Sequence, residues 1–201
     1  MALKYCIFDI GNVCYPYDPR PLNDFFRSRT PDKKAFDQKG GIYAFDFDPF
    51  MKGQITLTQC CKDLCVYSSI TYTPALDAEV NQASHDTIGP FYNETKLLMA
   101  ELKKKGIQIC LLSNISPNLW DITENIVATD KRFLSYDLGL LKPDPEIYKV
   151  VLQKLNAQPS EVVFIDDQPR NIEAAQKLGI TGIVFNKNTI IDRVREVFML
   201  I

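Results

Sequence analysis

Short apolar runs that end at polar residues alternate with helical patterns through most of this 201-residue chain. Residues 4–8 form such a run before Asp9, and residues 161–165 form another before Asp166 and Asp167. Strands that alternate with helices favour a parallel sheet covered on both faces. The carboxyl ends of its strands then share one edge of the sheet, beyond which ligands bind. The alternation therefore predicts both a fold class and the place of a functional site.

Five strands and four helices that follow or separate them are expected from this pattern. The strands are expected at residues 4–8, 107–112, 132–136, 161–165 and 182–185. The helices are expected at residues 94–105, 144–156, 171–178 and 188–199. Gly106 and Gly179 follow two of these helices, at the position where glycine commonly ends a helix. The chain is therefore expected to form an α/β fold.

The alternation breaks between residues 15 and 92. Two helices are expected there, at residues 56–69 and 74–87, behind a segment rich in Tyr and Phe. We interpret this part as a small helical cap inserted after the first strand. The predicted domains are a core of residues 1–15 and 90–201 and a cap of residues 16–89.

Charge and hydropathy exclude several classes of partner. The 23 basic and 25 acidic side chains give a formal net charge of −2 with both signs interspersed, so no surface for nucleic acid or membranes is expected. No apolar run reaches the roughly 18 residues that span a bilayer, and no signal peptide is expected. A cytoplasmic location with reduced cysteines follows. The single histidine, His85, excludes a His-rich metal site. The sequence does not indicate the oligomeric state.

Three of the six cysteines, Cys60, Cys61 and Cys65, lie close together. The spacing of Cys61 and Cys65 places them on one face of a helix. No second cysteine pair at zinc spacing accompanies them in the sequence. We therefore favour small buried side chains over a metal or redox site.

The polar residues at the strand ends form a candidate site. Asp9, Asp166 and Asp167 are expected within a few ångströms of one another, where like charges raise each other's pKa. A divalent cation that prefers oxygen ligands removes this conflict, and Mg²⁺ fits. Ser113 can donate to a phosphoryl oxygen and Lys142 can neutralise it. A carboxylate held in line with phosphorus can act as a nucleophile.

Four motifs, in order along the chain, resemble those of the haloacid dehalogenase superfamily. They are Phe8-Asp9-Ile10-Gly11-Asn12-Val13, Leu111-Leu112-Ser113-Asn114, Gly139-Leu140-Leu141-Lys142-Pro143-Asp144-Pro145-Glu146-Ile147-Tyr148 and Val163-Phe164-Ile165-Asp166-Asp167. The first motif is similar to that of a subgroup with Asp-x-Gly-Asn-Val, which includes bacterial sugar-phosphate phosphatases similar to the amino-terminal domain of soluble epoxide hydrolases. The resemblance implies a Rossmann-like, three-layer parallel sheet of strand order 5-4-1-2-3 with the cap after the first strand.

The same resemblance implies a Mg²⁺-dependent phosphatase acting on a small phosphorylated metabolite, such as a sugar phosphate. Asp9 would be the nucleophile and would form an aspartyl-phosphate. Lys142 would bridge this nucleophile and the phosphate. Ser113 and the backbone of Asn114 would hold the phosphoryl oxygens.

Metal ligands are also implied by the resemblance. The side chains of Asp9 and Asp167 and the carbonyl of Gly11 would bind Mg²⁺. Asp166 would support the metal directly or through water. Asn171 would orient the loop after Asp167, although it is equally well placed to cap the helix that follows it.

One position departs from the pattern of most phosphatases in this superfamily. They have Asp two residues after the nucleophile, where it protonates the leaving group and later activates water, whereas this chain has Gly11. General acid–base help of this kind is worth about 10²–10⁴-fold. Asp18, on the loop that could fold back over Asp9, is our hypothetical substitute.

Two other functions stay open. A catalytically weak phosphate-binding or regulatory protein would explain Gly11, but it has no use for a nucleophile such as Asp9. A 2-haloacid dehalogenase would suit Ser113 and Asn114. Such enzymes need no metal and lack the adjacent acids Asp166 and Asp167, so this alternative is less favoured.

Overall fold

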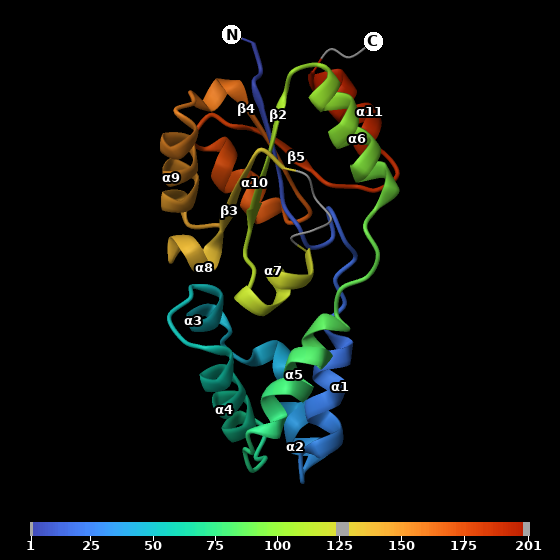
Figure 1. Ribbon diagram of the computed structural model, residues 1–201, viewed down its shortest axis with the longest axis vertical. Helices are drawn as coiled ribbons and strands as arrows, with labels where there is room; N and C mark the ends of the chain where they lie inside the picture. The colour runs from blue at the N-terminus through green and yellow to red at the C-terminus, as the bar shows by residue number, and fades with distance from the viewer. Residues whose placement is uncertain (1, 124–128, 199–201) are drawn as a thin grey trace.

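The computed structural model describes residues 2–123 and 129–198 (Figure 1). Its core is a parallel sheet with the strands in the order β3-β2-β1-β4-β5. The strands are β1 (Tyr5–Phe8), β2 (Gln108–Ser113), β3 (Lys131–Leu134), β4 (Val162–Asp166) and β5 (Thr181–Val184). Phe8 lies beside Leu111 of β2 and Ile165 of β4, so the three central strands run in register. The predicted α/β fold and strand order 5-4-1-2-3 are confirmed.

Helices cover both faces of the sheet (Figure 1). They are α6 (Asn93–Lys104), α7 (Pro117–Thr123), α9 (Pro145–Leu155), α10 (Pro169–Gln176) and α11 (Ile190–Val197). Alternate residues of β1 point to opposite faces. Phe8 packs in the layer of α6 and α11 with Leu102 and Val194, whereas Ile7 packs in the layer of α9 and α10 with Val151 and Ile172. Burial of these apolar side chains is the main stabilising contribution to the three layers.

Three short elements differ from the sequence prediction. The strand expected at 132–136 ends at Leu134, because the helix α8 (Ser135–Leu138) begins there and ends at Gly139 with a φ of 66°. Helix α10 begins at Pro169, whose fixed φ suits a first helical turn. Helix α7 was not expected, although Pro117 at its start is a recognised helix signal. A single 3₁₀ turn, η2 (Pro159–Glu161), precedes β4.

The inserted segment forms a separate helical lobe, the cap (Figure 1). Its elements are α1 (Arg20–Arg29), α2 (Lys33–Gln38), η1 (Gly41–Ala44), α3 (Asp48–Met51), α4 (Leu57–Tyr67) and α5 (Ala75–His85). The cap has its own apolar core, in which Phe26 and Phe36 are buried. Cys60, Cys61 and Cys65 lie in the same core on α4 as free thiols. Aromatic residues before α4 therefore contribute mainly to packing within the cap.

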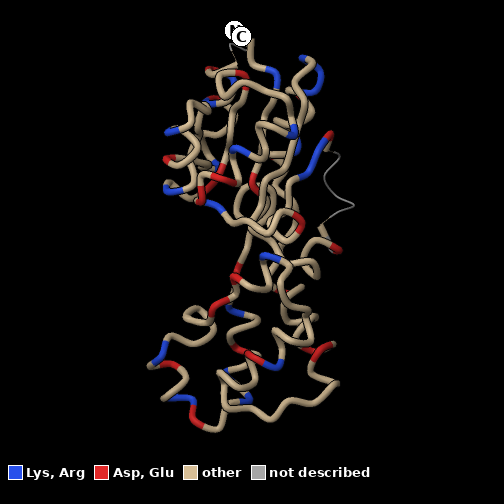
Figure 2. The backbone as a smooth tube through the Cα atoms, turned by 90° about the vertical axis from the view of Figure 1, so that its left-hand side faces the viewer, with Lys and Arg blue, Asp and Glu red and all other residues tan. Residues whose placement is uncertain are grey.

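Two linkers, residues 16–19 and 86–92, join the cap to the core (Figure 1). They are tied to each other, since Asp18 N–H donates to Thr87 O at 2.8 Å and Gly89 N–H donates to Pro16 O at 3.0 Å. The molecule is elongated, and charges of both signs are spread over its two lobes (Figure 2). Within the described residues, no helix has the length and apolar character needed to cross a membrane.

A close approach of the cap to the core occurs at Gly53, in the loop after α3. A Cβ at this position would lie 2.5 Å from Tyr136 O, and the φ of +67° also disfavours a side chain. Gly106 has a φ of +79° but nothing lies within 4 Å of its Cβ position, so only the backbone conformation disfavours a side chain there. We expect Gly53→Ala to lower the free energy of unfolding by about 1–3 kcal/mol more than Gly106→Ala does. Urea unfolding measures the difference, and equal losses would contradict this contact.

Candidate active site

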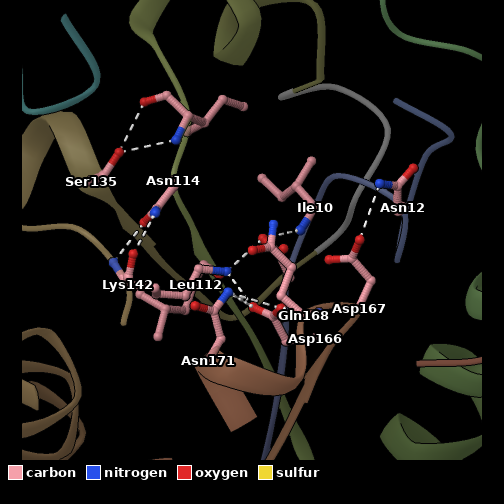
Figure 3. Close-up of polar contacts among 12 residues, drawn as sticks. Ile10, Asn12, Leu112, Asn114, Ser135, Lys142, Asp166, Asp167, Gln168 and Asn171 are labelled. Atoms are coloured by element: carbon pink, nitrogen blue, oxygen red, sulfur yellow. Dashed lines mark hydrogen bonds and ion pairs between the residues drawn. The ribbon is translucent and has the colours of Figure 1, made fainter. Parts of the chain in front are cut away.

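Three carboxylates meet at the carboxyl edge of the sheet, and two of them, Asp166 and Asp167, are labelled in Figure 3. Asp9 follows β1, while Asp166 and Asp167 lie at the end of β4, the neighbouring strand. Ligand oxygens of the three side chains all lie within 4.8 Å of one another. Asp9 and Asp166 are buried and Asp167 is partly buried. The parallel register thus brings together acids that are far apart in the sequence.

The ammonium group of Lys142 lies between two of these carboxylates (Figure 3). Its Nζ is 2.8 Å from Asp9 Oδ1 and 2.6 Å from Asp166 Oδ2. A further hydrogen bond goes to Leu112 O at 3.0 Å. Burial opposes the charged form of Lys142, but the two carboxylates outweigh it and raise the pKa of the ammonium. Two hydrogen bonds and one further ion pair thus surround the ammonium group of Lys142, so the side chain fixes Asp9 against Asp166.

Asp9 is a buried carboxylate with an elevated pKa. Burial raises the pKa of Asp9 to about 6, against the opposing attraction of Lys142. Its Oδ1 accepts a hydrogen bond from Ile10 N–H at 2.7 Å and forms the ion pair with Lys142. The group is therefore ionised at neutral pH, and both of these bonds fall on one of its two oxygens.

Asp166 is surrounded by donors. Its Oδ1 accepts from Gln168 N–H at 2.8 Å and from Asn171 Nδ2 at 2.9 Å, while Oδ2 accepts from Lys142 and from Asn171 Nδ2 at 3.0 Å. Asn171 lies inside α10, whose N-cap is Gln168, so it does not cap this helix. The amide of Asn171 instead holds Asp166 at the end of β4.

Asp167 has a different environment from its neighbour. Its Oδ2 accepts a hydrogen bond from Asn12 Nδ2 at 3.1 Å (Figure 3). Burial raises the pKa of Asp167, whereas the Asn12 hydrogen bond lowers it. Asn12 thus orients Oδ2 of Asp167, whereas Oδ1 takes no part in this hydrogen bond.

The three carboxylates fit a divalent cation with oxygen preference such as Mg²⁺. The ammonium group of Lys142 offsets one of the three negative charges, so two remain when all three acids are ionised. Asp166 shares each oxygen between two donors, so Asp9 and Asp167 are the side chains best placed to bind such an ion directly. Asp166 would then act through water.

The end of β2 supplies Ser113 to the same edge, and the loop after it supplies Asn114. Ser113 is buried and directly follows Leu112, whose carbonyl binds Lys142. Asn114 clamps the Lys142 peptide, because its Nδ2 donates to Lys142 O at 2.9 Å and its Oδ1 accepts from Lys142 N–H at 2.8 Å. Ser135 Oγ binds both the N–H and the carbonyl of Ile115 at 3.0 Å (Figure 3). Asn114 therefore fixes the Lys142 peptide, and Ser135 at the start of α8 holds the residue that follows Asn114.

Gly11 and Asp18 contact residues outside the carboxylate cluster. Gly11 is in the loop after Asp9, and a Cβ there would meet only Tyr17 Cβ at 3.7 Å. Asp18 begins the cap side of the first linker and binds Arg20, whose guanidinium lowers the pKa of Asp18. The carboxylate of Asp18 is half exposed, and in this conformation its charge is committed to Arg20. A role in protonation requires that ion pair to open.

Sequence reasoning missed the contributions of Asn12, Gln168 and Ser135 to this site. Asn12 offered one signal, since it stands in the first motif beside Gly11. Gln168 acts through its backbone N–H, which no side-chain pattern indicates. Ser135 lies beyond the motifs in the sequence and contacts them only through the fold.

Loss of Lys142 is expected to destabilise the protein. Lys142→Met would leave Asp9 and Asp166 buried without their counter-ion, which costs about 3–5 kcal/mol of unfolding free energy. Lys149→Met is the matched control, because it removes a Lys from an exposed ion pair with Glu146 and should cost at most about 1 kcal/mol. Chemical denaturation of the metal-free proteins measures both values. Equal stability of the two variants would contradict a buried ionic contact at Lys142.

Comparisons with known proteins find relatives that match most of this chain. A sesquiterpene phosphatase of Aspergillus oryzae is 25% identical over 202 residues, covering 90% of this chain and 89% of that protein. Bifunctional epoxide hydrolase 2 of Mus musculus is 26% identical over 216 residues, covering 92% of this chain but only 36% of the enzyme. This chain therefore corresponds to about a third of that longer protein.

A solved structure shows the same fold. An HAD family enzyme from Bacteroides thetaiotaomicron, in complex with magnesium and inorganic phosphate, superimposes with a TM-score of 0.76 at 23% identity. The match covers 92% of this chain and 96% of that enzyme. The family model for haloacid dehalogenase-like hydrolases matches residues 3–179, which include every strand except β5. The chain therefore belongs to the haloacid dehalogenase-like hydrolase family.

Proposed function

We propose that this protein is a Mg²⁺-dependent phosphatase that hydrolyses a small phosphate ester through an aspartyl-phosphate. Asp9 carries the proposal, because it is a buried carboxylate, ionised at neutral pH and fixed by Lys142 beside two further acids. The phosphatase name of the Aspergillus relative and the magnesium and phosphate in the Bacteroides structure support it. We also propose that it acts in the cytoplasm, as its composition predicts.

In the proposed reaction, Asp9 Oδ2 attacks phosphorus, because Oδ1 is held by Ile10 N–H and Lys142. The ester P–O bond breaks, the phosphoryl group passes to Asp9, and the leaving alkoxide takes a proton from water or from Asp18 and departs as the alcohol. Ser113 Oγ and Asn114 N–H hold phosphoryl oxygens during this transfer. Bound Mg²⁺ would offset the negative charge that gathers around the phosphoryl group. Water then cleaves the aspartyl-phosphate, which releases phosphate and restores the Asp9 carboxylate.

The substrate is proposed to be a small phosphorylated metabolite. The cap faces the core across the linkers, and lids of this kind exclude water and contact the leaving group. Sugar phosphates are the first class to test, as the motif resemblance implies. Isoprenoid phosphates are the second class, because the Aspergillus relative is named a sesquiterpene phosphatase.

Phosphate release from a panel of esters tests this function. The panel contains sugar phosphates, nucleotides, isoprenyl phosphates and an aryl phosphate, each assayed with Mg²⁺ and with a chelator. We expect release only with Mg²⁺. Full release in the presence of the chelator would contradict the proposal, and chloride release from 2-chloropropionate would favour a dehalogenase.

Binding of Mg²⁺ is expected to weaken as the pH falls through about 6. Asp9 must lose its proton to bind a metal. Because burial raises the pKa of Asp9 to about 6, its carboxyl group is mostly protonated below that pH. The dissociation constant for Mg²⁺ should rise up to about tenfold for each pH unit below that value. Calorimetric titration at about pH 7.5 and about pH 5 measures it. Equal affinities at the two values would contradict a role for Asp9 as a ligand.

Gly11 favours a second candidate function, a phosphate-binding or regulatory protein with weak catalysis. The absence of a side chain at this position removes the acid that most related phosphatases use. This candidate predicts saturable binding of inorganic phosphate without turnover of any ester. Multiple turnovers on one ester would exclude it.

A further inference from the structure

Asn12 is a site residue with no assigned role in the proposed reaction. It lies in the loop after β1, is partly buried and has a φ of 57°, in the left-handed region. Asn and Gly are the residues that adopt this conformation most readily. The backbone at position 12 therefore permits Gly, and the presence of Asn calls for a reason in its side chain.

The amide of Asn12 makes two hydrogen bonds in opposite directions. Its Nδ2 donates to Asp167 Oδ2 at 3.1 Å (Figure 3), and its Oδ1 accepts from Tyr17 N–H at 3.0 Å. An ionised carboxylate only accepts and a backbone N–H only donates. Only one orientation of the amide therefore satisfies both partners, which fixes its two ends.

The loop itself does not need these bonds to close. Cys14 N–H and Tyr15 N–H both donate to Ile10 O, at 2.8 and 3.1 Å. Thr95 Oγ1 from α6 donates to Val13 O at 2.6 Å and anchors the loop to the core. The Asn12 side chain therefore connects this loop, which is held by other bonds, to Asp167 and Tyr17.

The second partner of the Asn12 amide, Tyr17, lies in the segment that connects the core to the cap. Tyr17 belongs to the first linker and forms an isolated antiparallel bridge with Ile88 of the second linker. Its neighbour Asp18 donates its N–H to Thr87 O. Asn12 thus links a carboxylate of the candidate metal site to the pair of linkers that carries the cap.

We propose that Asn12 is a positioning residue that holds Asp167 ready for Mg²⁺ and fastens this carboxylate to the linkers. The proposal depends on the proposed function for the identity of the metal. Residues that orient metal ligands typically change metal affinity by 10–100-fold when they are removed. Because Asn12 holds one oxygen of Asp167, its removal lets the carboxylate rotate and raises the entropic cost of metal binding.

Substitution of Asn12 by Gly tests this proposal with little risk to folding, because Gly suits the φ of 57°. We expect the dissociation constant for Mg²⁺ in Asn12→Gly to rise at least about tenfold in calorimetric titrations without substrate. The melting temperature of the metal-free protein should stay close to that of the wild type. Asn156→Gly is the matched control, since Asn156 ends α9 with a φ of 53°, and its Mg²⁺ affinity should not change.

Amide hydrogen exchange tests the linker half of the proposal. Exchange at Tyr17 N–H should accelerate in Asn12→Gly, while exchange at Asp18 N–H, which donates to Thr87 O, should stay slow. Unchanged exchange at Tyr17 would overturn the link to the cap. An unchanged Mg²⁺ affinity in folded Asn12→Gly would overturn the positioning of Asp167.

These outcomes are distinct from failure of the proposed function. Mg²⁺ affinity is measured without an ester, so the result for Asn12→Gly does not depend on finding the substrate. A wild-type protein that binds no Mg²⁺ overturns both proposals. A wild-type protein that releases phosphate, with an Asn12→Gly variant that binds Mg²⁺ equally well, overturns this one alone.

Discussion

Asp9→Asn is expected to lower phosphate release at least about 10³-fold, because an amide oxygen is a far weaker nucleophile than a carboxylate. The substitution keeps the size of the side chain, and its Oδ1 can still accept from Lys142 and Ile10 N–H. Initial rates on the best ester of the panel, with saturating Mg²⁺, measure the loss.

The fold of this variant should remain intact. Burial raises the pKa of Asp9 above its ordinary value, so the ionised carboxylate opposes folding at neutral pH and a neutral amide should not destabilise the chain strongly. Asp24→Asn, at an exposed position of α1, is the matched control and should keep full activity. Asp9→Asn with more than a tenth of wild-type activity would contradict Asp9 as the nucleophile.

Gly11→Asp is expected to increase turnover of alkyl phosphates by about 10²-fold. The new carboxyl group would protonate the leaving alkoxide and later activate water, as the motif resemblance implies. The position has room, because a Cβ meets only Tyr17 Cβ at 3.7 Å and the φ of Gly11 is outside the left-handed region. Steady-state rates on a sugar phosphate measure the gain.

The choice of ester separates this acid effect from other causes. An aryl phosphate has a leaving group that is stable as a phenolate, so Gly11→Asp should increase its turnover far less. Gly11→Asn, which has the same size but no acid, should give no gain on either ester. An equal gain for Asp and Asn would contradict the missing-acid explanation. If Asp18 already substitutes, Asp18→Asn should lower turnover in the wild type but not in Gly11→Asp.

Much of the core fold could be predicted from the sequence. Buried strands such as the one expected at 161–165 are apolar from Val162 to Ile165 and end at charged residues, so their position along the chain is clear. The cap was harder to predict, because η1 and α3 are single turns whose conformation depends on packing within the lobe. The third strand was expected to end at residue 136, two residues too late, since Ser135 can continue a strand or begin a helix and here begins α8, where it bonds Ile115.

The candidate site was predictable in its residue types but not in its hydrogen bonds. Parallel register alone brings Asp9 and Asp166 together, as the strand ends implied. The sequence could not show that the ammonium group of Lys142 contacts Asp9, Asp166 and Leu112 O, because these contacts depend on how the loop after α8 folds. It also could not show that Asp18 of the first linker pairs with Arg20, the first residue of α1.

Trapping the phosphorylated protein tests the central claim most directly. A reaction of wild-type protein with Mg²⁺ and its best ester is quenched in acid during turnover, digested and examined by mass spectrometry. We predict a phosphoryl group on the peptide that contains Asp9, and none at that peptide in Asp9→Asn. Phosphate release without any phosphorylated peptide, or with the phosphoryl group on a residue other than Asp9, would contradict this account.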